Sequence, residues 1–467
     1  MIPHGKRHIP RRRKRPSGRS ANAGSTPRLT PRADGGLKAV FASIGRPKSR
    51  QFKPDAYQLK SVETVDHSDC LVTAPTGAGK TWIAEQAIRR IFNRGGKSWY
   101  ATPLKALSNA KHAEFSALFG SGNVGILTGD RKENPEAPII IGTTEILRNH
   151  LYDAMHQGVT METDFVVLDE AHFLGDEDRG VVWEEVMIYL PSRIPMLMLS
   201  ATVGNAEQIA GWLTSIRGKK CQVVEETKRP VPLFPLFLHP SGMLYPLQSK
   251  SGKSGKRKIH KRVASFLKSK SPRDNFSSPG LPPFGDILKV LKKFRLLPAI
   301  FFLKSRADCD NSLNLCTATL APDSDRATAL RRRIRELVKN SPHVAKHRQI
   351  RHLETKAIGA HHAGQLPAWK LVLETLMSEG LLDAIFATST VAAGVNFPAR
   401  SIVVLNSDRF NGREFLPLSP TEFHQMTGRA GRRGKDRIGF AIAIPGRFMD
   451  IRLISRLITA PPSPVVS

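Results

Sequence analysis

The chain has 467 residues, and its 71 lysines and arginines exceed its 40 aspartates and glutamates, so the formal net charge is +31. At roughly 150 residues per domain this length predicts two to four domains, and 40% hydrophobic residues are enough to form their cores. The longest apolar runs fall far short of the ~18 residues of a membrane-spanning helix. Four cysteines without a CxxC spacing argue against a disulfide scaffold and a structural zinc site. The charge favours a polyanionic partner, either nucleic acid or an acidic membrane surface.

Residues 1–47 are rich in Arg, Pro, Ser and Gly. Between Lys6 and Arg50 the chain carries fourteen basic side chains against one acid, Asp34. Such a composition buries too little apolar surface to fold alone, so it predicts a basic disordered tail. We expect this tail to act as a non-specific, salt-sensitive tether to nucleic acid.

Residues 48–229 show a different pattern, in which short apolar runs alternate with amphipathic stretches. The pattern is typical of buried strands separated by helices, as in a parallel α/β sheet. The predicted strands include residues 70–73, 99–101, 139–141, 165–168 and 196–199.

Residues 230–283 are rich in Pro, Ser, Lys and Gly, and 250–262 is strongly basic, which predicts a linker or a surface insertion. The alternating pattern returns over 284–458, and a Pro-rich end follows over 459–467. The expected fold class is therefore α/β, with two parallel-sheet domains in tandem. The predicted strands of the second domain include residues 299–303, 384–387, 401–405 and 439–444.

The segment 74–81, APTGAGKT, follows a predicted strand and precedes a helical pattern, as a phosphate-binding loop requires. Gly77 and Gly79 let backbone N–H groups turn toward phosphate oxygens, and the helix N-terminus adds its positive dipole end. Lys80 would reach the β and γ phosphates of ATP, and the Thr81 hydroxyl would bind Mg²⁺. The other residues expected to line the ATP site here are Ala74, Pro75, Thr76 and Ala78, with Ala74 in the place of the usual first Gly.

A pair of carboxylates follows the later predicted strand 165–168. Asp169 is the expected Mg²⁺ partner, and Glu170 is expected to orient or deprotonate the water that attacks the γ phosphate. Combined with the phosphate-binding loop, the pair predicts an ATPase.

Three motifs resemble those of superfamily 2 helicases of the DEAH-box kind: DEAH at 169–172, SAT at 200–202 and QMTGRAGRRG at 425–434. Further stretches narrow the resemblance to the Ski-type RNA helicases, and it spans about residues 52–444. It implies two RecA-like domains, the ATP-binding one over 48–229 and the C-terminal one over 284–458, with ATP in the cleft between them. The stretches similar to the Ski-type enzymes are 101–109, 143–149, 179–185, 359–364 and 387–400.

The resemblance also implies roles for single residues. Arg429 and Arg432 resemble arginine fingers, which supply positive charge to a phosphoryl group in transit. Gln58 would hydrogen-bond the adenine edge, although an ordinary solvated glutamine on a helix is the alternative. The remaining implied residues are Gln425, Gly394 and Asn396 at the ATP site, and His172, Ser200 and Thr202 in the network that couples phosphate to nucleic acid.

Single-strand binding is expected on the loops at the strand ends of both domains, because rigid sheets that move relative to each other hold these loops in place. Hydroxyls and backbone amides contact phosphate without reading sequence, so we expect little sequence specificity. The candidates are Pro103, Lys105, Gly129, Thr143, Thr144 and Arg148 in the first domain, and Ser305, Arg306, His362 and Thr388 in the second.

The segment 409–415, RFNGREF, holds an Asn-Gly pair between aromatic residues, which predicts a β-hairpin. In the Ski-type branch and its DNA-repair relatives a hairpin at this place is a wedge at the duplex junction. By that resemblance Phe410 or Phe415 would stack on a terminal base pair. A surface hairpin without a strand-opening role is the alternative.

The expected function is that of an ATP-dependent helicase or translocase on RNA, with ATP and Mg²⁺ as cofactors and 3′-to-5′ polarity implied by the resemblance. The expected partners are single-stranded or partly duplex nucleic acid and an exonuclease or RNA-processing protein, with no membrane. We expect a monomeric motor in the cytoplasm, with a nuclear or nucleoid location left open. The alternatives are an ATP-gated clamp without processive unwinding and a DNA helicase of the same superfamily.

Ski-type enzymes continue past the second motor domain into a winged helix and a helical bundle with a ratchet helix. This sequence stops at Ser467, about 35 residues after Arg432, so we expect these domains to be absent. Either a fragment or a minimal motor is expected, with reduced processivity in both cases.

Overall fold

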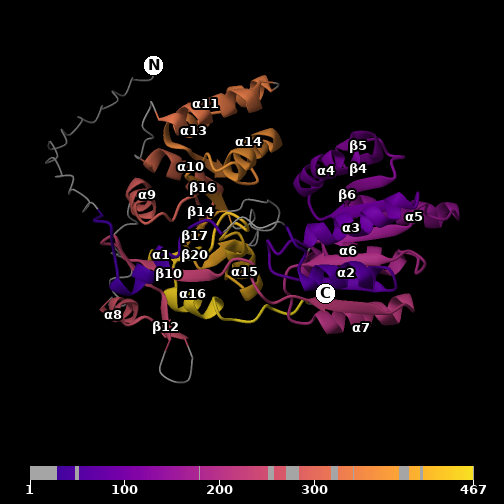
Figure 1. The fold of residues 1–467 in the computed structure, drawn as a ribbon, viewed down its shortest axis with the longest axis horizontal. Coiled ribbons are helices and arrows are strands. Elements are labelled where there is room, and N and C mark those ends of the chain that lie inside the picture. The colour runs from indigo at the N-terminus through magenta and orange to yellow at the C-terminus, as the bar shows by residue number, and fades with distance from the viewer. Residues whose placement is uncertain are drawn as a thin grey trace, which may run out of the picture.

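The computed structural model describes residues 29–47, 52–177, 179–250, 257–269, 283–316, 324–339, 341–388, 399–410 and 414–465. These residues fold into two α/β units that lie side by side (Figure 1). The expected α/β class with tandem, mostly parallel sheets is confirmed.

The first unit contains an eight-stranded sheet with the order β5-β4-β6-β3-β7-β8-β2-β9 in the described chain. All neighbours are parallel except β4 and β5. The central strands are buried along their whole length because helices cover both faces, which explains their continuous apolar runs. The strands are β2 (Asp69–Thr73), β3 (Ser98–Thr102), β4 (Val124–Thr128), β5 (Arg131–Glu133), β6 (Ile139–Thr143), β7 (Phe165–Asp169), β8 (Met196–Ser200) and β9 (Cys221–Glu225).

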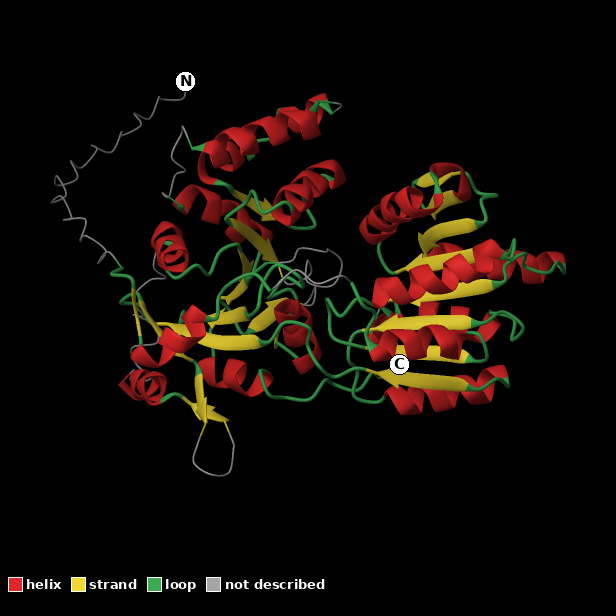
Figure 2. Ribbon diagram, viewed as in Figure 1, coloured by secondary structure: helices red, strands yellow, loops and turns green. Residues whose placement is uncertain are grey.

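Helices pack on both faces of this sheet (Figure 2). Side chains of α2, α3 and α4 share one apolar core with the strands, and those of α5, α6 and α7 share the other. The helices are α2 (Ala56–Val65), α3 (Lys80–Asn93), α4 (Lys105–Phe119), α5 (Thr144–Gln157), α6 (Gly180–Tyr189) and α7 (Ala206–Arg217), with short 3₁₀ turns η2 (Ser121–Asn123) and η3 (Ala171–Gly175).

The second unit contains a sheet of eight described strands with the order β1-β11-β10-β20-β17-β14-β16-β15. Only β10 and β11 pair antiparallel within it. Two hairpins, β12–β13 and β18–β19, lie outside this sheet. The strands are β1 (Arg32–Ala33), β10 (Leu233–Leu238), β11 (Met243–Pro246), β12 (Gln248–Lys250), β13 (Arg257–Ile259), β14 (Ala299–Leu303), β15 (Ile358–His361), β16 (Ala384–Thr388), β17 (Ser401–Val404), β18 (Asp408–Phe410), β19 (Phe415–Pro417) and β20 (Gly439–Ala443).

Two apolar cores also flank the second sheet. Side chains of α9 and α10 lie in one core, and those of α8, α11, α13, α14, α15 and α16 lie in the other. The helices are α1 (Lys38–Ala42), α8 (Lys261–Ser269), α9 (Phe284–Lys293), α10 (Arg306–Leu315), α11 (Asp325–Val338), α12 (Pro342–Ala345), α13 (Ile350–Lys356), α14 (Pro367–Ser378), α15 (Pro420–Gly428) and α16 (Ile451–Leu457), with the 3₁₀ turn η1 (Gly35–Leu37).

Part of the predicted disordered tail is structured. Residues 29–47 pack on the second unit, where β1 pairs parallel with β11 and Leu37 is fully buried. The ring of Phe41 stacks on that of Phe294 with centroids 5.2 Å apart. The prediction of disorder up to residue 47 is corrected here, because a few apolar side chains among the basic ones form one buried face. Residues 1–28 lie outside the described residues.

The predicted linker or insertion over 230–283 also contains sheet strands. The apolar run Leu233–Leu238 forms β10, which pairs with β20, and β11 then returns beside it. Phe237 and Leu238 are fully buried. The second unit therefore begins before residue 284, and within this span the β12–β13 hairpin and α8 extend from it (Figure 1).

The chain crosses from the second unit back to the first at its C-terminal end (Figure 1). The backbone N–H of Val465 donates to Asn205 Oδ1 at 2.8 Å, and Asn205 Nδ2 donates to the Val465 carbonyl at 2.7 Å. The N–H of Gly204 donates to the Ser463 carbonyl at 3.1 Å. Residues 459–465, which we call the crossing segment, thus join α16 to the loop after β8.

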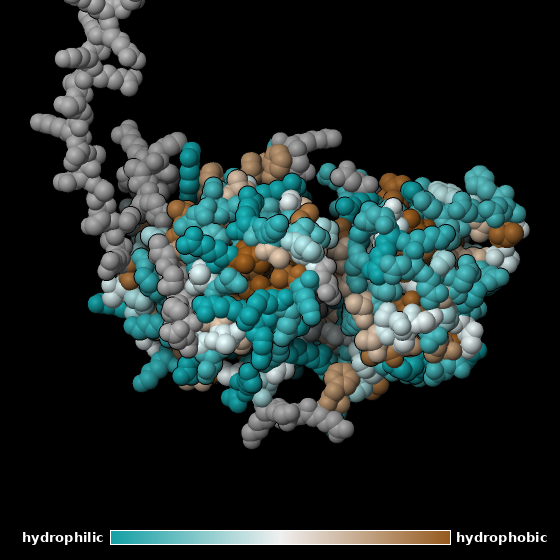
Figure 3. Space-filling view, turned by 90° about the horizontal axis from the view of Figure 1, so that it is seen from above, coloured by the Kyte–Doolittle hydropathy of each residue, from teal (hydrophilic) through white to brown (hydrophobic). Residues whose placement is uncertain are grey.

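The face shown in Figure 3 is mainly hydrophilic over both units. Among the described residues, no helix has the length and apolarity needed to cross a bilayer.

A buried ion pair holds β2, the strand that leads to the phosphate-binding loop. Arg217 Nε lies 2.7 Å from Asp69 Oδ2, and both side chains are almost fully buried. Arg217 also donates to the carbonyls of Leu190 and Ile194, and Asp69 accepts from the N–H of Met196. The pair thereby ties the start of β2 to α7 and to the start of β8.

We expect Arg217→Met to lower the free energy of unfolding by about 3 kcal/mol, because the buried Asp69 would lose its hydrogen-bonded partner and keep only Lys219, whose Nζ lies 3.8 Å from it. Urea denaturation measures this loss. The matched control is Arg333→Met, which removes a surface pair with Glu379 and should cost far less. Equal losses in the two variants would show that burial of the Asp69 pair is unimportant.

Candidate nucleotide and nucleic-acid site

The phosphate-binding loop connects the end of β2 to the start of α3. Gly77 and Gly79 have φ values of 81° and 93°, a conformation that favours glycine. Lys80 Nζ donates to the Ala74 carbonyl at 2.8 Å, so the ammonium lies inside the loop. Desolvation lowers the pKa of Lys80, while the charge of Glu170 opposes this shift.

Strand register brings three predicted motifs to the same edge of the first sheet. Ser200 on β8 lies beside Thr73 on β2, and Asp169 on β7 lies beside Leu199. Asp169 Oδ1 accepts from the Glu170 N–H at 2.9 Å. Because parallel strands end at a common edge, the DEAH and SAT motifs both lie next to the phosphate-binding loop.

The carboxylate of Asp169 lies in an unusual electrostatic environment. Burial and then the neighbouring Glu170 raise its pKa, while Lys111, a hydrogen bond from Tyr100 and Lys80 oppose the rise. The Tyr100 hydroxyl donates to Asp169 Oδ2 at 2.7 Å. The sequence reasoning missed Tyr100 and Lys111, because only the fold brings β3 and α4 against the end of β7.

His172 is buried beside the second carboxylate. Burial, followed by the charge of Lys80, lowers the pKa of His172 to about 4, so its ring is neutral at physiological pH. Its Nδ1 lies 3.4 Å from Glu170 Oε2, and neither ring nitrogen has a hydrogen-bond partner within the described part of the chain. His172 can therefore accept or donate a bond when a phosphate or a water enters the site.

Helix α15 brings the second unit against the phosphate-binding loop. A Cβ atom on Gly428 would lie 2.8 Å from Thr76 Cβ, so only a glycine allows this approach. Arg429 follows directly, where burial lowers its pKa and the charge of Glu170 raises it. Gln425 lies on the same helix, one turn before Arg429.

Arg229 was not predicted, and it holds the end of α15 in place. Its guanidinium donates to the carbonyls of Thr427 and Ala430, both at 3.0 Å. Burial lowers the pKa of Arg229 to about 10. The sequence offered only one hint of this role of Arg229, its position directly before the Pro-rich span that begins at Pro230.

The structure separates the two arginines that follow Gly431. Arg432, predicted as an arginine finger, instead donates to both carboxylate oxygens of Asp436, at 2.7 and 3.0 Å. Arg433 reaches the phosphate-binding loop, with bonds of 2.6 Å to the Ala78 carbonyl and 2.8 Å to Asp55. Asp436 captures Arg432 because a backbone turn over residues 432–436 brings the two side chains together and Asp436 is itself buried.

Gln58 also contacts the phosphate-binding loop. Its Nε2 donates to the Gly79 carbonyl at 2.8 Å, and its Oε1 accepts from the Asp55 N–H at 2.7 Å. The neighbouring Tyr57 hydroxyl donates to the Ala78 carbonyl at 2.8 Å. Gln58 is fully buried by these contacts, so a base edge could reach its second N–H or second lone pair only after a local rearrangement. Gly394 and Asn396 lie outside the described residues.

The nucleic-acid candidates of the first unit lie after β3, β4 and β6. Pro103 and Lys105 follow β3, and Lys105 Nζ is 3.2 Å from Asp130 Oδ1, next to Gly129. Thr143 ends β6 and is the N-cap residue of α5. The remaining two are held by other protein groups: Thr144 donates to the Thr102 carbonyl at 3.2 Å, and Arg148 pairs with Glu185 at 3.2 Å.

The candidates of the second unit occupy the matching edge of its sheet. Ser305 caps α10 by accepting from the Asp308 N–H at 3.1 Å, and Arg306 is exposed beside it. Thr388 ends β16 beside Leu303. A further candidate, His362, is buried and lies 3.4 Å from Asp310.

The predicted hairpin is present as β18–β19. Phe410 and Phe415 face each other in the ladder, with ring centroids 5.0 Å apart, and each is about half exposed. Lys304 Nζ lies 3.6 Å from the centroid of the Phe415 ring and 2.8 Å from Asp408. The Asn-Gly turn at 411–413 lies outside the described residues.

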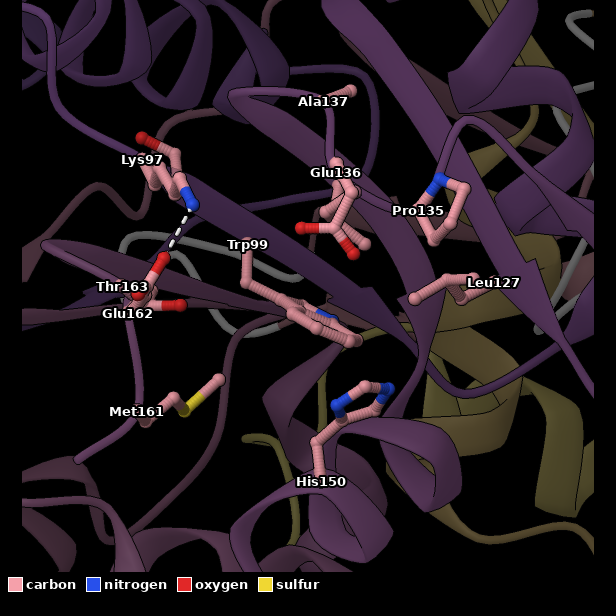
Figure 4. Close-up of a pocket in the computed structure, with 12 residues that line it drawn as sticks. Lys97, Trp99, Leu127, Pro135, Glu136, Ala137, His150, Met161, Glu162 and Thr163 are labelled. Atoms are coloured by element: carbon pink, nitrogen blue, oxygen red, sulfur yellow. Dashed lines mark hydrogen bonds and ion pairs between the residues drawn. The ribbon is translucent and has the colours of Figure 1, made fainter. Parts of the chain in front are cut away.

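A cavity of about 190 Å³ lies at the opposite edge of the first sheet, near the start of β3 (Figure 4). Trp99 and His150 lie against each other there, with ring centroids 5.0 Å apart. Lys97 and Glu162 pair at 2.7 Å at its rim. Since the phosphate-binding loop lies at the carboxyl ends of the strands, this cavity is separate from the site above.

The donor atoms at the phosphate-binding loop suit Mg²⁺. The Thr81 hydroxyl and the Asp169 carboxylate are hard oxygen ligands, and Mg²⁺ commonly takes one or two such protein ligands together with substrate phosphates. The described residues contain no cluster of three or more His, Cys, Asp or Glu side chains that could hold a metal alone. The site therefore fits a metal that arrives with a nucleotide.

We expect Tyr100→Phe to lower the free energy of unfolding by about 1–3 kcal/mol, because the buried Asp169 carboxylate loses a donor. The folded-state pKa of Asp169 is raised, so its ionisation reduces stability as the pH rises through that pKa. The loss from Tyr100→Phe should therefore be larger above this pKa than below it. The control is Tyr152→Phe, which removes a hydroxyl beside the partly exposed Glu185. A loss of stability in Tyr100→Phe that does not depend on pH would contradict the expectation.

Comparison with known proteins agrees with this geometry. Residues 55–209 match the family model described as DEAD/DEAH box helicase. The chain is 39% identical over 416 residues to the probable helicase HelY of Mycobacterium tuberculosis, covering 84% of this chain and 45% of that protein. It is 35% identical over 458 residues to the DExH-box ATP-dependent RNA helicase DExH15 chloroplastic of Arabidopsis thaliana, covering 89% and 39%.

It is also 34% identical over 438 residues to superkiller complex protein 2 of Homo sapiens, covering 89% of this chain and 35% of that protein. The chain thus spans less than half the length of each of these relatives. By the motifs, their arrangement and these matches, residues 55–209 belong to the DEAD/DEAH box helicase family, and the similarity to these helicases continues into the second unit.

Proposed function

We propose that this chain is the ATP-hydrolysing motor of a helicase or translocase that acts on RNA. The observation that carries the proposal is the meeting of three groups at one place between the two sheets. The first unit supplies two of them, the phosphate-binding loop and the carboxylates of Asp169 and Glu170. The second unit supplies the third, the arginines Arg429 and Arg433. Acids, a lysine and arginines around a glycine-rich loop are the parts that phosphoryl transfer needs.

Each side chain has a role in this chemistry. Lys80 would leave the Ala74 carbonyl to hold the β and γ phosphates. Thr81 and Asp169 would hold Mg²⁺, which neutralises charge on the phosphate oxygens when it is bound. Glu170 would orient the attacking water and accept its proton.

The arginines complete the site from the second unit. Arg429 already shares a buried environment with Glu170 and would stabilise the charge that develops on the γ phosphate. Arg433 touches the loop that holds the β phosphate. Arg432 would have to leave Asp436 to act as a second finger, so its participation requires a rearrangement of that ion pair.

Movement would follow from opening and closing of the two units. Their contacts at the site are few, chiefly Gly428 against Thr76 and Arg433 against the phosphate-binding loop. Exchange of ATP for ADP would alter these contacts and shift the two sets of strand-end loops relative to each other. A single strand lying across both sets would then advance by a step.

RNA as the substrate is supported by the resemblance of the motifs and by the names of relatives, of which DExH15 chloroplastic is termed an RNA helicase. The 3′-to-5′ polarity and a partnership with an exonuclease or RNA-processing protein are proposed on the same resemblance. A clamp that hydrolyses ATP without unwinding, and a DNA helicase, are the competing functions.

We expect Lys80→Ala and Glu170→Gln each to abolish RNA-stimulated ATP hydrolysis, since one removes the phosphate-binding charge and the other the group that activates water. The assay compares single-stranded RNA, single-stranded DNA and no polymer at two salt concentrations. Glu162→Gln is the control, because it neutralises a surface carboxylate that pairs with Lys97. Turnover like that of the unmodified chain in either site variant would refute the assignment, and stronger stimulation by DNA would favour a DNA helicase.

We expect the double substitution Phe410→Ala and Phe415→Ala to reduce the number of base pairs opened per ATP several-fold while ATP hydrolysis persists. The two exposed rings would otherwise stack on a terminal base pair. Leu371→Ala removes an exposed apolar side chain on α14, away from the hairpin, and is the control. Unchanged strand displacement in the double variant would leave the hairpin without a strand-opening role.

A further inference from the structure

A buried lysine that the mechanism above does not use contacts the expected metal ligand. Lys111 lies on α4, and its side chain is about 10% exposed. Its Nζ donates to the Thr81 hydroxyl at 2.9 Å and to Glu114 Oε2 at 2.8 Å. The ammonium therefore bridges α3, which begins at the phosphate-binding loop, and the acid on its own helix.

Acids from three elements face this ammonium. Glu114 lies one turn further along α4, and Glu85 projects from α3, where burial and then Glu114 raise its pKa and Lys111 lowers it. Asp169 comes from β7, and Lys111 is among the charges that lower its pKa against the larger effect of burial. Lys111 thus donates to one of the oxygens expected to hold Mg²⁺, Thr81 Oγ1, and its charge also acts on the other, the Asp169 carboxylate.

A hydroxyl oxygen has two lone pairs, so geometry alone would let Thr81 accept from Lys111 and also bind a metal. The charges oppose this arrangement. A divalent cation and an ammonium on the same oxygen would lie within about 5 Å of each other, where like charges in a poorly solvated site repel strongly. Lys111 has an alternative hydrogen-bond partner, because Glu114 Oε2 already accepts from its ammonium.

We propose that Lys111 competes with Mg²⁺ for the Thr81 hydroxyl and so sets the metal concentration at which nucleotide binds. This role presupposes the nucleotide site proposed above. When Mg²⁺ takes the Thr81 oxygen, Lys111 gives it up and keeps its bond to Glu114. Lys111 acts in this way as a positioning residue, since it touches the metal ligand and not the reacting phosphate.

The test is equilibrium binding of a fluorescent ATP analogue across a series of Mg²⁺ concentrations, without turnover. In Lys111→Met, which keeps the length of the side chain and removes its charge, we expect the half-saturating Mg²⁺ concentration to fall about tenfold. Lys111→Arg should stay near the unmodified chain. An unchanged or higher half-saturating concentration in Lys111→Met would overturn the proposal.

A second variant gives a prediction of opposite sign. Glu114→Gln weakens the alternative partner of Lys111, so the ammonium stays on Thr81 and the half-saturating Mg²⁺ concentration should rise. If Lys111 only stabilised the fold, the half-saturating Mg²⁺ concentration would not fall in Lys111→Met and rise in Glu114→Gln. A fall in Glu114→Gln would likewise overturn the proposal.

The matched control is Lys97→Met. Lys97 also pairs with a glutamate, Glu162, at 2.7 Å, but at the edge of the first sheet opposite the phosphate-binding loop. The Mg²⁺ dependence of this variant should equal that of the unmodified chain. Nucleotide binding by the unmodified chain distinguishes a failure of the proposed function from a failure of the role of Lys111. If it binds no nucleotide at any Mg²⁺ concentration, the proposed function fails, and if it binds normally, the variants decide the role of Lys111 alone.

Discussion

The parallel register of β7, β8 and β2 is the constraint on which the candidate site depends. It places Asp169 beside Leu199 and Ser200 beside Thr73, so that motifs about 30 to 130 residues apart in the sequence end at one edge. The pair Asp69–Arg217 fixes the opposite end of β2. A slip of one residue in this register would turn Asp169 to the other face of the sheet.

The second unit completes the site through very close contacts. The approach of Gly428 to Thr76 is possible only without a side chain at residue 428, and Arg229 holds the end of α15 that carries this glycine. Arg433 then meets the carbonyl of Ala78. The positive charge delivered to the phosphate-binding loop therefore depends on how the end of α15 is held, which makes a remote residue such as Arg229 part of the geometry.

Much of the fold and of the site could be predicted from the sequence, because the signals are local. Continuous apolar runs indicate buried parallel strands, and the order of strand, glycine-rich loop and helix identifies the phosphate site around Lys80. The contact of Arg433 with the phosphate-binding loop could not be predicted, and neither could the ion pair of Arg432 with Asp436, since both depend on how the chain turns after Gly431. Tyr100 and Lys111 were missed for the same reason: each acts on a residue that only the folded sheet brings close.

The errors at the domain boundaries have a compositional cause. The basic residues of 1–47 are concentrated before residue 29, and those of 230–283 lie after residue 249, so the average composition of each span conceals the apolar side chains that bury against the second sheet. Leu37 and Phe41 are enough to fix the first segment, and Leu233–Leu238 forms a sheet strand in spite of its proline. In segments of this kind, the spacing of a few apolar residues is more informative than the average composition.

The crossing segment limits how the two units can move. The chain lies on the second unit up to residue 47 and on the first from residue 52, and it returns to the second near Arg229. It reaches the first unit again at residues 459–465, where Asn205 and Val465 exchange two hydrogen bonds. Separation of the two units is therefore opposed at several points along the chain, and the C-terminal one is held by side-chain and backbone hydrogen bonds rather than by the covalent chain alone. A motion that opens the cleft widely at the crossing segment would have to break these bonds first.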